Sequence, residues 1–276
     1  MKKLSGKVAV VTGAAGILCR HFVETLLEEG AKVALLDLNP EAGEKLVAEL
    51  KEKGYKGMLV VKCDVLDKES IKAARKAVND CLGKVDILVN GAGGNHPKAT
   101  TPAEQLLKDT PLEDSFFGID TDSFTWVNNL NFMGTLLPTQ EFGLDMVEQG
   151  GGCVINISSM SAYAPMTKVP AYSAAKAAIN NFTCWLAVHL GKANIRVNAI
   201  APGFFSTTQN KFLMFEQDGK TLSARGHKII NNTPMGKFGK PEDLKGVLRF
   251  LATDESEFVT GITIPVDGGF LAYSGV

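Results

Sequence analysis

The sequence predicts an α/β fold of the Rossmann type, a doubly wound sheet of about seven parallel strands with helices on both faces. Short β-branched runs alternate with longer amphipathic runs along all 276 residues. Most of the short runs are almost continuously apolar, which is typical of strands buried on both faces of a parallel sheet. No linker or repeat interrupts this alternation. We therefore expect a single domain over 1–276, with a nucleotide-binding half at about 1–150 and a catalytic half at about 151–276.

The elements follow in order along the chain. Strands are expected at 7–11, 32–36, 57–62, 85–89, 153–158, 195–200 and 262–266. Helices are expected at 17–29, 40–53, 68–82, 122–149, 170–190 and 241–253. Pro40 and Pro241 fit the first turn of a helix, where a missing N–H costs least. Two segments, 94–121 and 203–233, are long for connections, and loops of that length are often functional.

Composition excludes several classes of protein. The net charge is −1 with acids and bases interspersed, so neither nucleic acid nor a membrane surface is an expected partner. The first seven residues lack an apolar signal core, and no apolar run reaches about 18 residues. The five cysteines are scattered, so we expect neither a disulfide framework nor a metal site. The sequence predicts a soluble, cytoplasmic protein.

The turn after the first expected strand is a candidate phosphate site. It reads TGAAGIL and includes Gly13, Gly16, Ile17 and Leu18. A turn that leads from a strand into a helix can aim several N–H groups at a pyrophosphate, although a plain strand-to-helix turn would read similarly. Asp37 ends the second strand, 24 residues after Gly13, where a carboxylate can bind an adenosine ribose.

The residue type at Asp37 bears on the choice of cofactor. A carboxylate repels a 2′-phosphate, and no arginine follows it, so NAD(H) is expected in preference to NADP(H). A solvated loop acid is the alternative interpretation. Two further turns, at Asp64-Val65 and at Asn90-Gly91-Ala92-Gly93, follow the third and fourth strands at the same edge of the sheet.

The catalytic half contains a tyrosine and a lysine at helical spacing. Tyr172 and Lys176 are four residues apart, so they share one helix face, and Ser159 follows the preceding strand. A nearby ammonium favours the phenolate and would lower the tyrosine pKa from about 10. Such a tyrosine can exchange a proton with an alcohol or carbonyl oxygen during hydride transfer. A surface contact between the two side chains would give the same spacing.

The motifs together resemble the short-chain dehydrogenase/reductase family over nearly the whole chain. They run in order as VTGAAG, an aspartate after the second strand, CDV, NGAG, NLNFMG, INISS, YSAAK, NAIAPG and GITIPVDGG. The resemblance implies that Tyr172 is the acid/base and that Lys176 lowers its pKa and holds the nicotinamide ribose. It further implies that Ser159 binds the reacting oxygen and that Asn131 supports a water and proton relay to Lys176.

The resemblance also implies a set of cofactor-binding positions, with Thr207 at the nicotinamide carboxamide. The set is Gly13, Gly16, Ile17, Leu18, Asp37, Asp64, Val65, Asn90, Ala92, Gly93, Tyr172, Lys176, Pro202, Gly203 and Thr207. Two departures stand out. The family pattern TGxxxGxG places glycines where this chain has Ile17 and Cys19, and Gly91 replaces a usual asparagine. We expect Gly16 to take over the close backbone approach and Cys19 to be small enough for the helix–strand contact.

The substrate is suggested by the run GGNHPKATT, which opens the long segment after the fourth strand. Its polar residues suit a hydroxyl-rich anion, although His96 and Lys98 could simply solvate a loop. The run resembles the branch of the family that interconverts D-fructuronate and D-mannonate, with Asn95, His96, Ser159, Ser161 and Tyr172 as substrate-binding residues. The alternatives are another sugar-acid or polyol dehydrogenase, such as a gluconate 5-dehydrogenase type, and a non-catalytic NAD-sensing scaffold.

The second long segment combines phenylalanines with bases. Its apolar stripe, Phe204 to Phe215, fits a core or subunit contact, whereas the family resemblance implies a mobile cover over the substrate. Candidate partners for a substrate carboxylate are Lys211, Arg225, His227 and Lys228. The resemblance also implies a homotetramer or homodimer assembled through 122–149, 170–190 and the tail 268–276.

Overall fold

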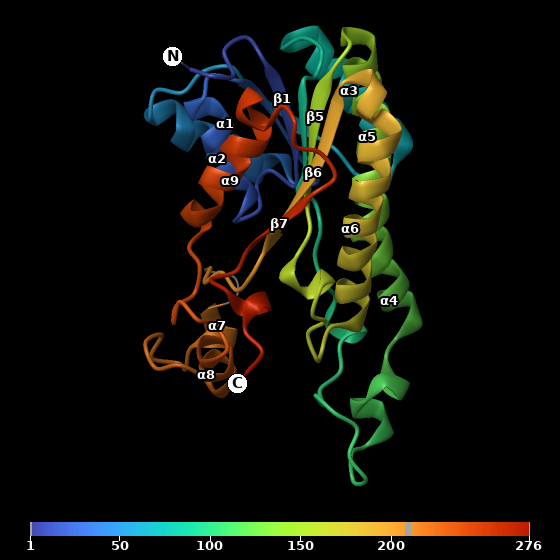
Figure 1. The fold of residues 1–276 in the computed structure, drawn as a ribbon, viewed down its shortest axis with the longest axis vertical. Helices are drawn as coiled ribbons and strands as arrows, with labels where there is room; N and C mark the ends of the chain where they lie inside the picture. The colour runs from blue at the N-terminus through green and yellow to red at the C-terminus, as the bar shows by residue number, and fades with distance from the viewer. Residues whose placement is uncertain (1, 208–210, 276) are drawn as a thin grey trace.

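The computed structural model describes residues 2–207 and 211–275. Its seven strands form one parallel sheet in the order β3-β2-β1-β4-β5-β6-β7 (Figure 1). The strands are β1 (Val8–Thr12), β2 (Lys32–Asp37), β3 (Met58–Lys62), β4 (Ile87–Asn90), β5 (Gly152–Ile157), β6 (Ile195–Pro202) and β7 (Thr263–Val266). The predicted fold class is confirmed, and every expected strand is found within two residues of its predicted bounds.

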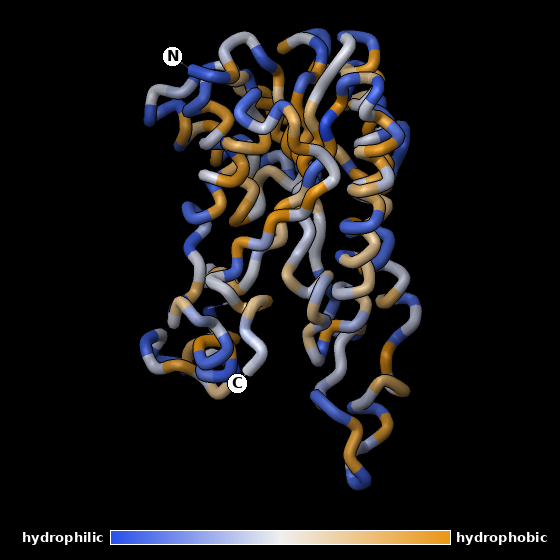
Figure 2. Tube along the Cα trace, viewed as in Figure 1, coloured by the Kyte–Doolittle hydropathy of each residue, from blue (hydrophilic) through white to orange (hydrophobic). Residues whose placement is uncertain are grey.

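Helices cover both faces of the sheet. They are α1 (Cys19–Glu28), α2 (Pro40–Glu52), α3 (Lys68–Cys81), α4 (Thr121–Asn128), α5 (Gly134–Gln149), α6 (Pro170–Leu190), α7 (Lys211–Met214), α8 (Ala224–Asn231) and α9 (Lys245–Ala252). Helices α1, α2 and α9 pack on one face, and α3, α5 and α6 on the other. Figure 2 shows apolar residues concentrated along the strands and the inner helix faces. Pro40 begins α2 as expected.

The expected helix at 122–149 is interrupted. Five residues, Asn129–Met133, form a π turn between α4 and α5. Within it, the Asn131 amide donates to the carbonyl oxygen of Val127 at 2.8 Å. This side-chain bond competes with the regular backbone ladder, which accounts for the local change of helix type. The expected helix at 241–253 likewise begins with a 3-10 turn, Pro241–Leu244, before α9.

Both long segments extend beyond the carboxyl ends of the strands. Segment 94–121 contains three 3-10 turns, at Pro97–Ala99, Leu112–Asp114 and Phe116–Gly118. Segment 203–233 contains α7 and α8, which the sequence analysis did not predict. The two segments lie on opposite sides of the lower part of Figure 1, so that they flank the end of the sheet where ligands bind in doubly wound folds.

No helix in the described parts of the chain is both long and apolar enough to cross a membrane. All five cysteines are unpaired. Within residues 2–207 and 211–275, no group of three or more His, Cys, Asp or Glu side chains could hold a metal ion.

A buried ion pair joins α3 and α5 beneath β4. Asp145 is fully buried, and its Oδ1 accepts hydrogen bonds from Arg75 Nη2 at 2.6 Å and Asn79 Nδ2 at 3.1 Å. Its second oxygen accepts the backbone N–H of Val85 at 3.2 Å. The carboxylate therefore links two helices to the residue that leads into β4.

We expect Asp145→Ala to lower the free energy of unfolding by about 3 kcal/mol, because it leaves the Arg75 guanidinium half-buried and without its closest anion. Urea unfolding measures this change. Lys76→Gln, which removes an exposed pair with Asp80, is the matched control and should leave stability unchanged. Equal effects of the two substitutions would contradict a structural role for Asp145.

Candidate active site

The turns after β1 and β4 lie in direct contact. Thr12 Oγ1 accepts the backbone N–H groups of Gly91 at 3.1 Å and Ala92 at 3.2 Å. Gly13 has a φ of +62°, and a Cβ there would lie 2.8 Å from the Cα of Ala92. Only glycine provides both this backbone conformation and this close approach.

The opening turn is closed by its own backbone. The N–H of Gly16 donates to the carbonyl oxygen of Gly13 at 2.9 Å, and a Cβ at Gly16 would lie 3.0 Å from that oxygen. Gly16 therefore closes the turn tightly against Gly13, and its expected approach to a phosphate stays a prediction. Ile17 and Leu18 follow it, both half-buried, and Leu18 directly precedes α1.

The two departures from the family pattern form one packing arrangement. Cys19 is buried, with its Sγ 3.6 Å from the carbonyl oxygen of Gly91. A Cβ on Gly91 would lie only 2.3 Å from that sulfur. Cys19 therefore fills the space that a side chain at position 91 would need. Burial raises the pKa of the Cys19 thiol to about 12, so the sulfur is an inert packing group.

Asp37 is bound to the opening turn. Its Oδ2 accepts the N–H of Ala15 at 3.0 Å, and its Oδ1 accepts the N–H of Asn39 at 3.0 Å. The carboxylate is thus oriented at the end of β2, as a ribose-binding acid must be, and differs from a freely solvated loop acid. On the next turn, Asp64 is exposed, whereas Val65 is buried against Gly134.

The side chain of Asn90 is buried in the interior of the protein. Its Nδ2 donates to Thr139 Oγ1 at 2.8 Å and to Asn156 Oδ1 at 2.9 Å, and Asn156 in turn donates to Thr183 Oγ1 at 2.9 Å. The side chain therefore belongs to a buried polar chain between the sheet and its helices. Only the backbone of Asn90 remains for a cofactor at the edge of the sheet.

The predicted cofactor-binding positions after β6 lie in two places, beside β7 and at a surface hollow. The N–H of Gly203 donates to Val266 at 2.9 Å, and a Cβ at Gly203 would lie 2.6 Å from the Cα of Asp267. Pro202 pairs with Val266 in the sheet. Thr207 lines the same surface hollow as Ile17, which brings these two predicted positions to one region.

The four predicted catalytic residues converge at the carboxyl ends of β4 and β5. Lys176 Nζ lies 5.5 Å from the centre of the Tyr172 ring, and Ser159 hydrogen-bonds Tyr172. Gly93 lies close to the side chains of Asn131 and Lys176. A Cβ there would be 2.6 Å from Asn131 Oδ1 and 3.4 Å from Lys176 Nζ. Asn131 also binds the backbone of the β4 turn, donating to the carbonyl oxygen of Gly94 at 2.7 Å.

Burial is the main influence on the pKa values of Tyr172 and Lys176. Burial raises the pKa of Tyr172, and its hydrogen bond with Ser159 only partly opposes that shift. Burial also lowers the pKa of Lys176 to about 8. The ammonium donates to the carbonyl oxygen of Ile157 at 2.7 Å. Burial therefore favours the neutral phenol of Tyr172.

Ser161 contacts the catalytic serine. It is buried, and both its backbone N–H, at 3.1 Å, and its hydroxyl, at 3.0 Å, donate to Ser159 Oγ. Because Ser159 Oγ accepts these two bonds, its own proton is available to another acceptor. Ser161 therefore orients Ser159, and its expected contact with a substrate stays a prediction.

Asn95 and His96, two residues expected to bind the substrate, lie at the start of segment 94–121. Asn95 is exposed, and His96 packs edge-on against Trp126 with ring centres 5.7 Å apart. His96 Nδ1 also accepts the N–H of Lys98 at 3.3 Å, which begins the 3-10 turn. These contacts give His96 a structural role in segment 94–121.

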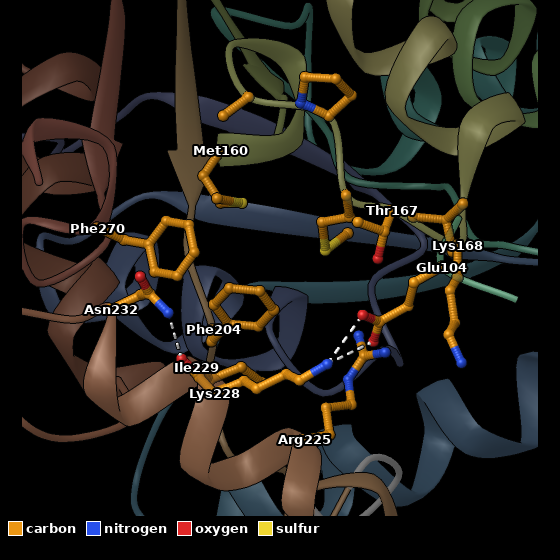
Figure 3. A pocket seen from close by; sticks show the side chains of 14 residues that line it. Glu104, Met160, Thr167, Lys168, Phe204, Arg225, Lys228, Ile229, Asn232 and Phe270 are labelled. Atoms are coloured by element: carbon orange, nitrogen blue, oxygen red, sulfur yellow. Dashed lines mark hydrogen bonds and ion pairs between the residues drawn. The ribbon is translucent and has the colours of Figure 1, made fainter. Parts of the chain in front are cut away.

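A cavity of about 270 Å³ begins at Met160, the residue after Ser159 (Figure 3). Phe204 and Phe270 form part of its apolar wall. The cations that line it are Lys168, Arg225 and Lys228, and Glu104 pairs with Lys228. Of the four bases suggested for a carboxylate, two line the cavity. Lys211 instead lies over Phe215 at 5.8 Å, and His227 is not among the lining residues.

Glu104 and Lys168 were missed by the sequence analysis. Both residues are far from α8 in the sequence and line the same cavity as α8 only in the folded chain. The length of segment 94–121 was the one signal in the sequence that could have pointed to Glu104.

Comparison with known proteins agrees with this geometry. A model of the family described as enoyl-(acyl carrier protein) reductase matches residues 13–271. The chain belongs to the short-chain dehydrogenase/reductase family and is an oxidoreductase of that family.

Two relatives are similar to this chain over nearly its whole length. The uncharacterized oxidoreductase UxuB of Bacillus subtilis (strain 168) is 51% identical over 276 residues, covering 100% of this chain and 98% of that protein. A Haemophilus influenza structure with bound NAD, provisionally named a D-mannonate oxidoreductase, is 49% identical with a TM-score of 0.95. It covers 99% of this chain and 98% of its own.

A more distant structure carries a different substrate name. The gluconate 5-dehydrogenase of Burkholderia cenocepacia J2315, in complex with NADP and tartrate, is 27% identical with a TM-score of 0.84. The alignment covers 98% of this chain and 97% of that one.

We expect Gly91→Ala to destabilise the fold by about 1–3 kcal/mol, because its Cβ would overlap Cys19 Sγ and approach the carbonyl oxygen of Thr12. Adding Cys19→Gly should recover part of the loss, since it removes one of the two clashes. Cys19→Gly alone should retain NADH binding and activity. Urea unfolding of the four proteins measures the coupling, and strict additivity would show that the two positions do not share this space.

The lowered pKa of Lys176 predicts a pH-dependent stability. The unfolded chain holds this proton up to about pH 10.5, whereas the folded protein releases it near pH 8. Because the unfolded state binds more protons in this window, stability rises with pH there. Relative to Lys176→Met, the wild-type protein should gain on the order of 3 kcal/mol between pH 8 and 10.5. Cofactor-free urea unfolding tests this, and a constant difference between the two proteins would contradict it.

Proposed function

We propose that this chain is an NAD(H)-dependent oxidoreductase that interconverts a sugar-acid ketone and its alcohol, with D-fructuronate and D-mannonate as the pair. One observation carries the proposal. The cavity that begins at Met160, the residue after Ser159, is lined by three cations, Lys168, Arg225 and Lys228. Cations of this kind suit a substrate that carries a carboxylate. The name of the Haemophilus influenza structure supports the same choice.

The residues at the edge of the sheet fit a dinucleotide. Gly13 and Gly93 lack Cβ atoms, which lets the two turns pack closely against Ala92 and Asn131, and Asp37 is held beside the opening turn. The pyrophosphate would lie at the turn from Gly13 to Leu18, and the adenosine ribose at Asp37, which favours NAD(H) over NADP(H). The remaining contacts would come from Asp64, Val65, Asn90, Ala92, Gly93, Tyr172, Lys176, Pro202, Gly203 and Thr207.

The side chains of this chain supply the proton chemistry. When bound, the nicotinamide group gives or accepts the hydride. Tyr172 is protonated at neutral pH because burial raises its pKa, so it can donate a proton to a carbonyl oxygen during reduction. Ser159, which hydrogen-bonds Tyr172, would bind the same oxygen beside it. Lys176 and Asn131 both lie close to Gly93, where they would hold the nicotinamide ribose and a water relay.

A gluconate 5-dehydrogenase type of activity is the second candidate. The tartrate in the Burkholderia cenocepacia structure supports it, because tartrate is a hydroxylated carboxylate. A non-catalytic NAD-sensing scaffold is disfavoured, since the four side chains needed for turnover converge in one place.

We further propose that the protein is cytoplasmic and assembles as a homotetramer or homodimer. Exposed apolar side chains on α5 and α6, such as Val147 at 53% and Val188 at 84%, support assembly through these helices. Of the expected tail contact 268–276, Val276 lies outside the described residues.

A substrate panel tests the proposed function. Hexuronates, aldonates and polyols are each assayed with NAD(H) and NADP(H). We expect the highest kcat/KM with the D-fructuronate and D-mannonate pair and NAD(H). Tyr172→Phe should lower kcat by a factor of about 10²–10⁴ while NADH still binds. Absence of turnover with both compounds would overturn the substrate assignment, and equal efficiency with NADP(H) would overturn the role given to Asp37.

A further inference from the structure

The cavity beside Ser159 already contains a carboxylate of the chain itself. Glu104, from segment 94–121, reaches toward α8, where its Oε1 and Oε2 accept hydrogen bonds from Lys228 Nζ at 3.0 and 2.8 Å. Figure 3 shows this pair inside the ring of lining residues, with Arg225 next to it. The pair joins two segments that lie 124 residues apart in the chain.

The cations around Glu104 outnumber it. Lys228, Lys168 and Arg225 together hold the pKa of the Glu104 carboxyl below its ordinary value. Glu104 is the one acidic side chain among the described residues that line the cavity. In the same described portion, neither Lys168 nor Arg225 belongs to an ion pair. The cavity therefore has positive charge in excess, which a second anion could neutralise.

The pair is accessible and exchangeable. The side chain of Glu104 is 44% exposed and that of Lys228 is 65% exposed. Water screens such a pair, so it contributes little to the stability of the fold. A diffusing carboxylate can reach the same ammonium and compete for it.

We propose that Glu104 is a specificity-determining residue, an internal counterion that keeps Lys228 in place until the carboxylate of a polyhydroxy acid replaces it. Lys228 and Arg225 of α8 then bind the incoming carboxylate, and Met160 and the two phenylalanines contact the carbon chain. This inference rests on the proposed function only for the reaction that follows binding. The exchange itself can occur with any small hydroxylated carboxylate.

Replacement of Glu104 by a substrate carboxylate at Lys228 predicts the direction in which the affinity for acids changes. An internal carboxylate that must leave Lys228 weakens the binding of every acid and leaves neutral polyols unaffected. Removing its charge should therefore strengthen acid binding. If the Glu104–Lys228 pair instead closed over the bound substrate, removing the charge of Glu104 would weaken the binding of acids.

The test is calorimetric binding of D-mannonate, D-gluconate and D-mannitol to the NADH-loaded protein. Glu104→Gln should tighten binding of both acids roughly twofold to fivefold, the range expected for loss of one exposed pair, and leave D-mannitol unchanged. Lys228→Gln should weaken binding of both acids and leave D-mannitol unchanged. Glu113→Gln, on the same segment, and Lys220→Gln, before α8, are the matched controls and should behave as the wild type.

Unchanged or weaker acid binding in Glu104→Gln would overturn the proposal, as would equal shifts for the acids and D-mannitol. The proposed function is judged separately by turnover. If D-mannonate binds with this charge dependence but is not oxidised, the carboxylate subsite stands and the substrate assignment fails. If D-mannonate is oxidised while Glu104→Gln leaves acid binding unchanged, the assignment stands and the counterion proposal fails.

Discussion

The contact between the turns after β1 and β4 is the constraint on which the site depends. Thr12 Oγ1 binds two N–H groups of the β4 turn, and the missing Cβ of Gly13 allows the two backbones to approach. These strands are neighbours although they are far apart in sequence, which is where a doubly wound sheet opens a crevice for a ligand. The same β4 turn leads to Gly93, beside Lys176 and Asn131, so that one close approach aligns the cofactor turn with the catalytic side chains.

Local patterns in the sequence were sufficient to predict most of the fold. Continuous apolar runs located all seven strands because strands buried on both faces tolerate few polar residues. The spacing of Tyr172 and Lys176 predicted their proximity because four residues make about one helical turn. These predictions concern neighbours along the chain, or elements whose pattern repeats.

The rest depended on tertiary surroundings. The direction of the Asn90 side chain is set by Thr139 and Asn156, which come from other elements. The raised pKa of Tyr172 reflects burial that no spacing rule expresses. The pairing of Glu104 with Lys228 requires the relative placement of two irregular segments. Sequence patterns predicted which residues would carry charge and chemistry, but not which partner each residue would bind.

The π turn at 129–133 also changes which surface each end of this long helical stretch presents. A π turn contains about one residue more than an α turn, and each residue of a helix advances the direction of the side chains by about 100°. Helix α5 thereby faces the sheet and α3, whereas α4 contacts α6 and the 3-10 turn that begins segment 94–121. Deletion of one residue from 129–133 would rotate α4 against α5. The contact between α4 and the start of segment 94–121 is thus set by helical phase.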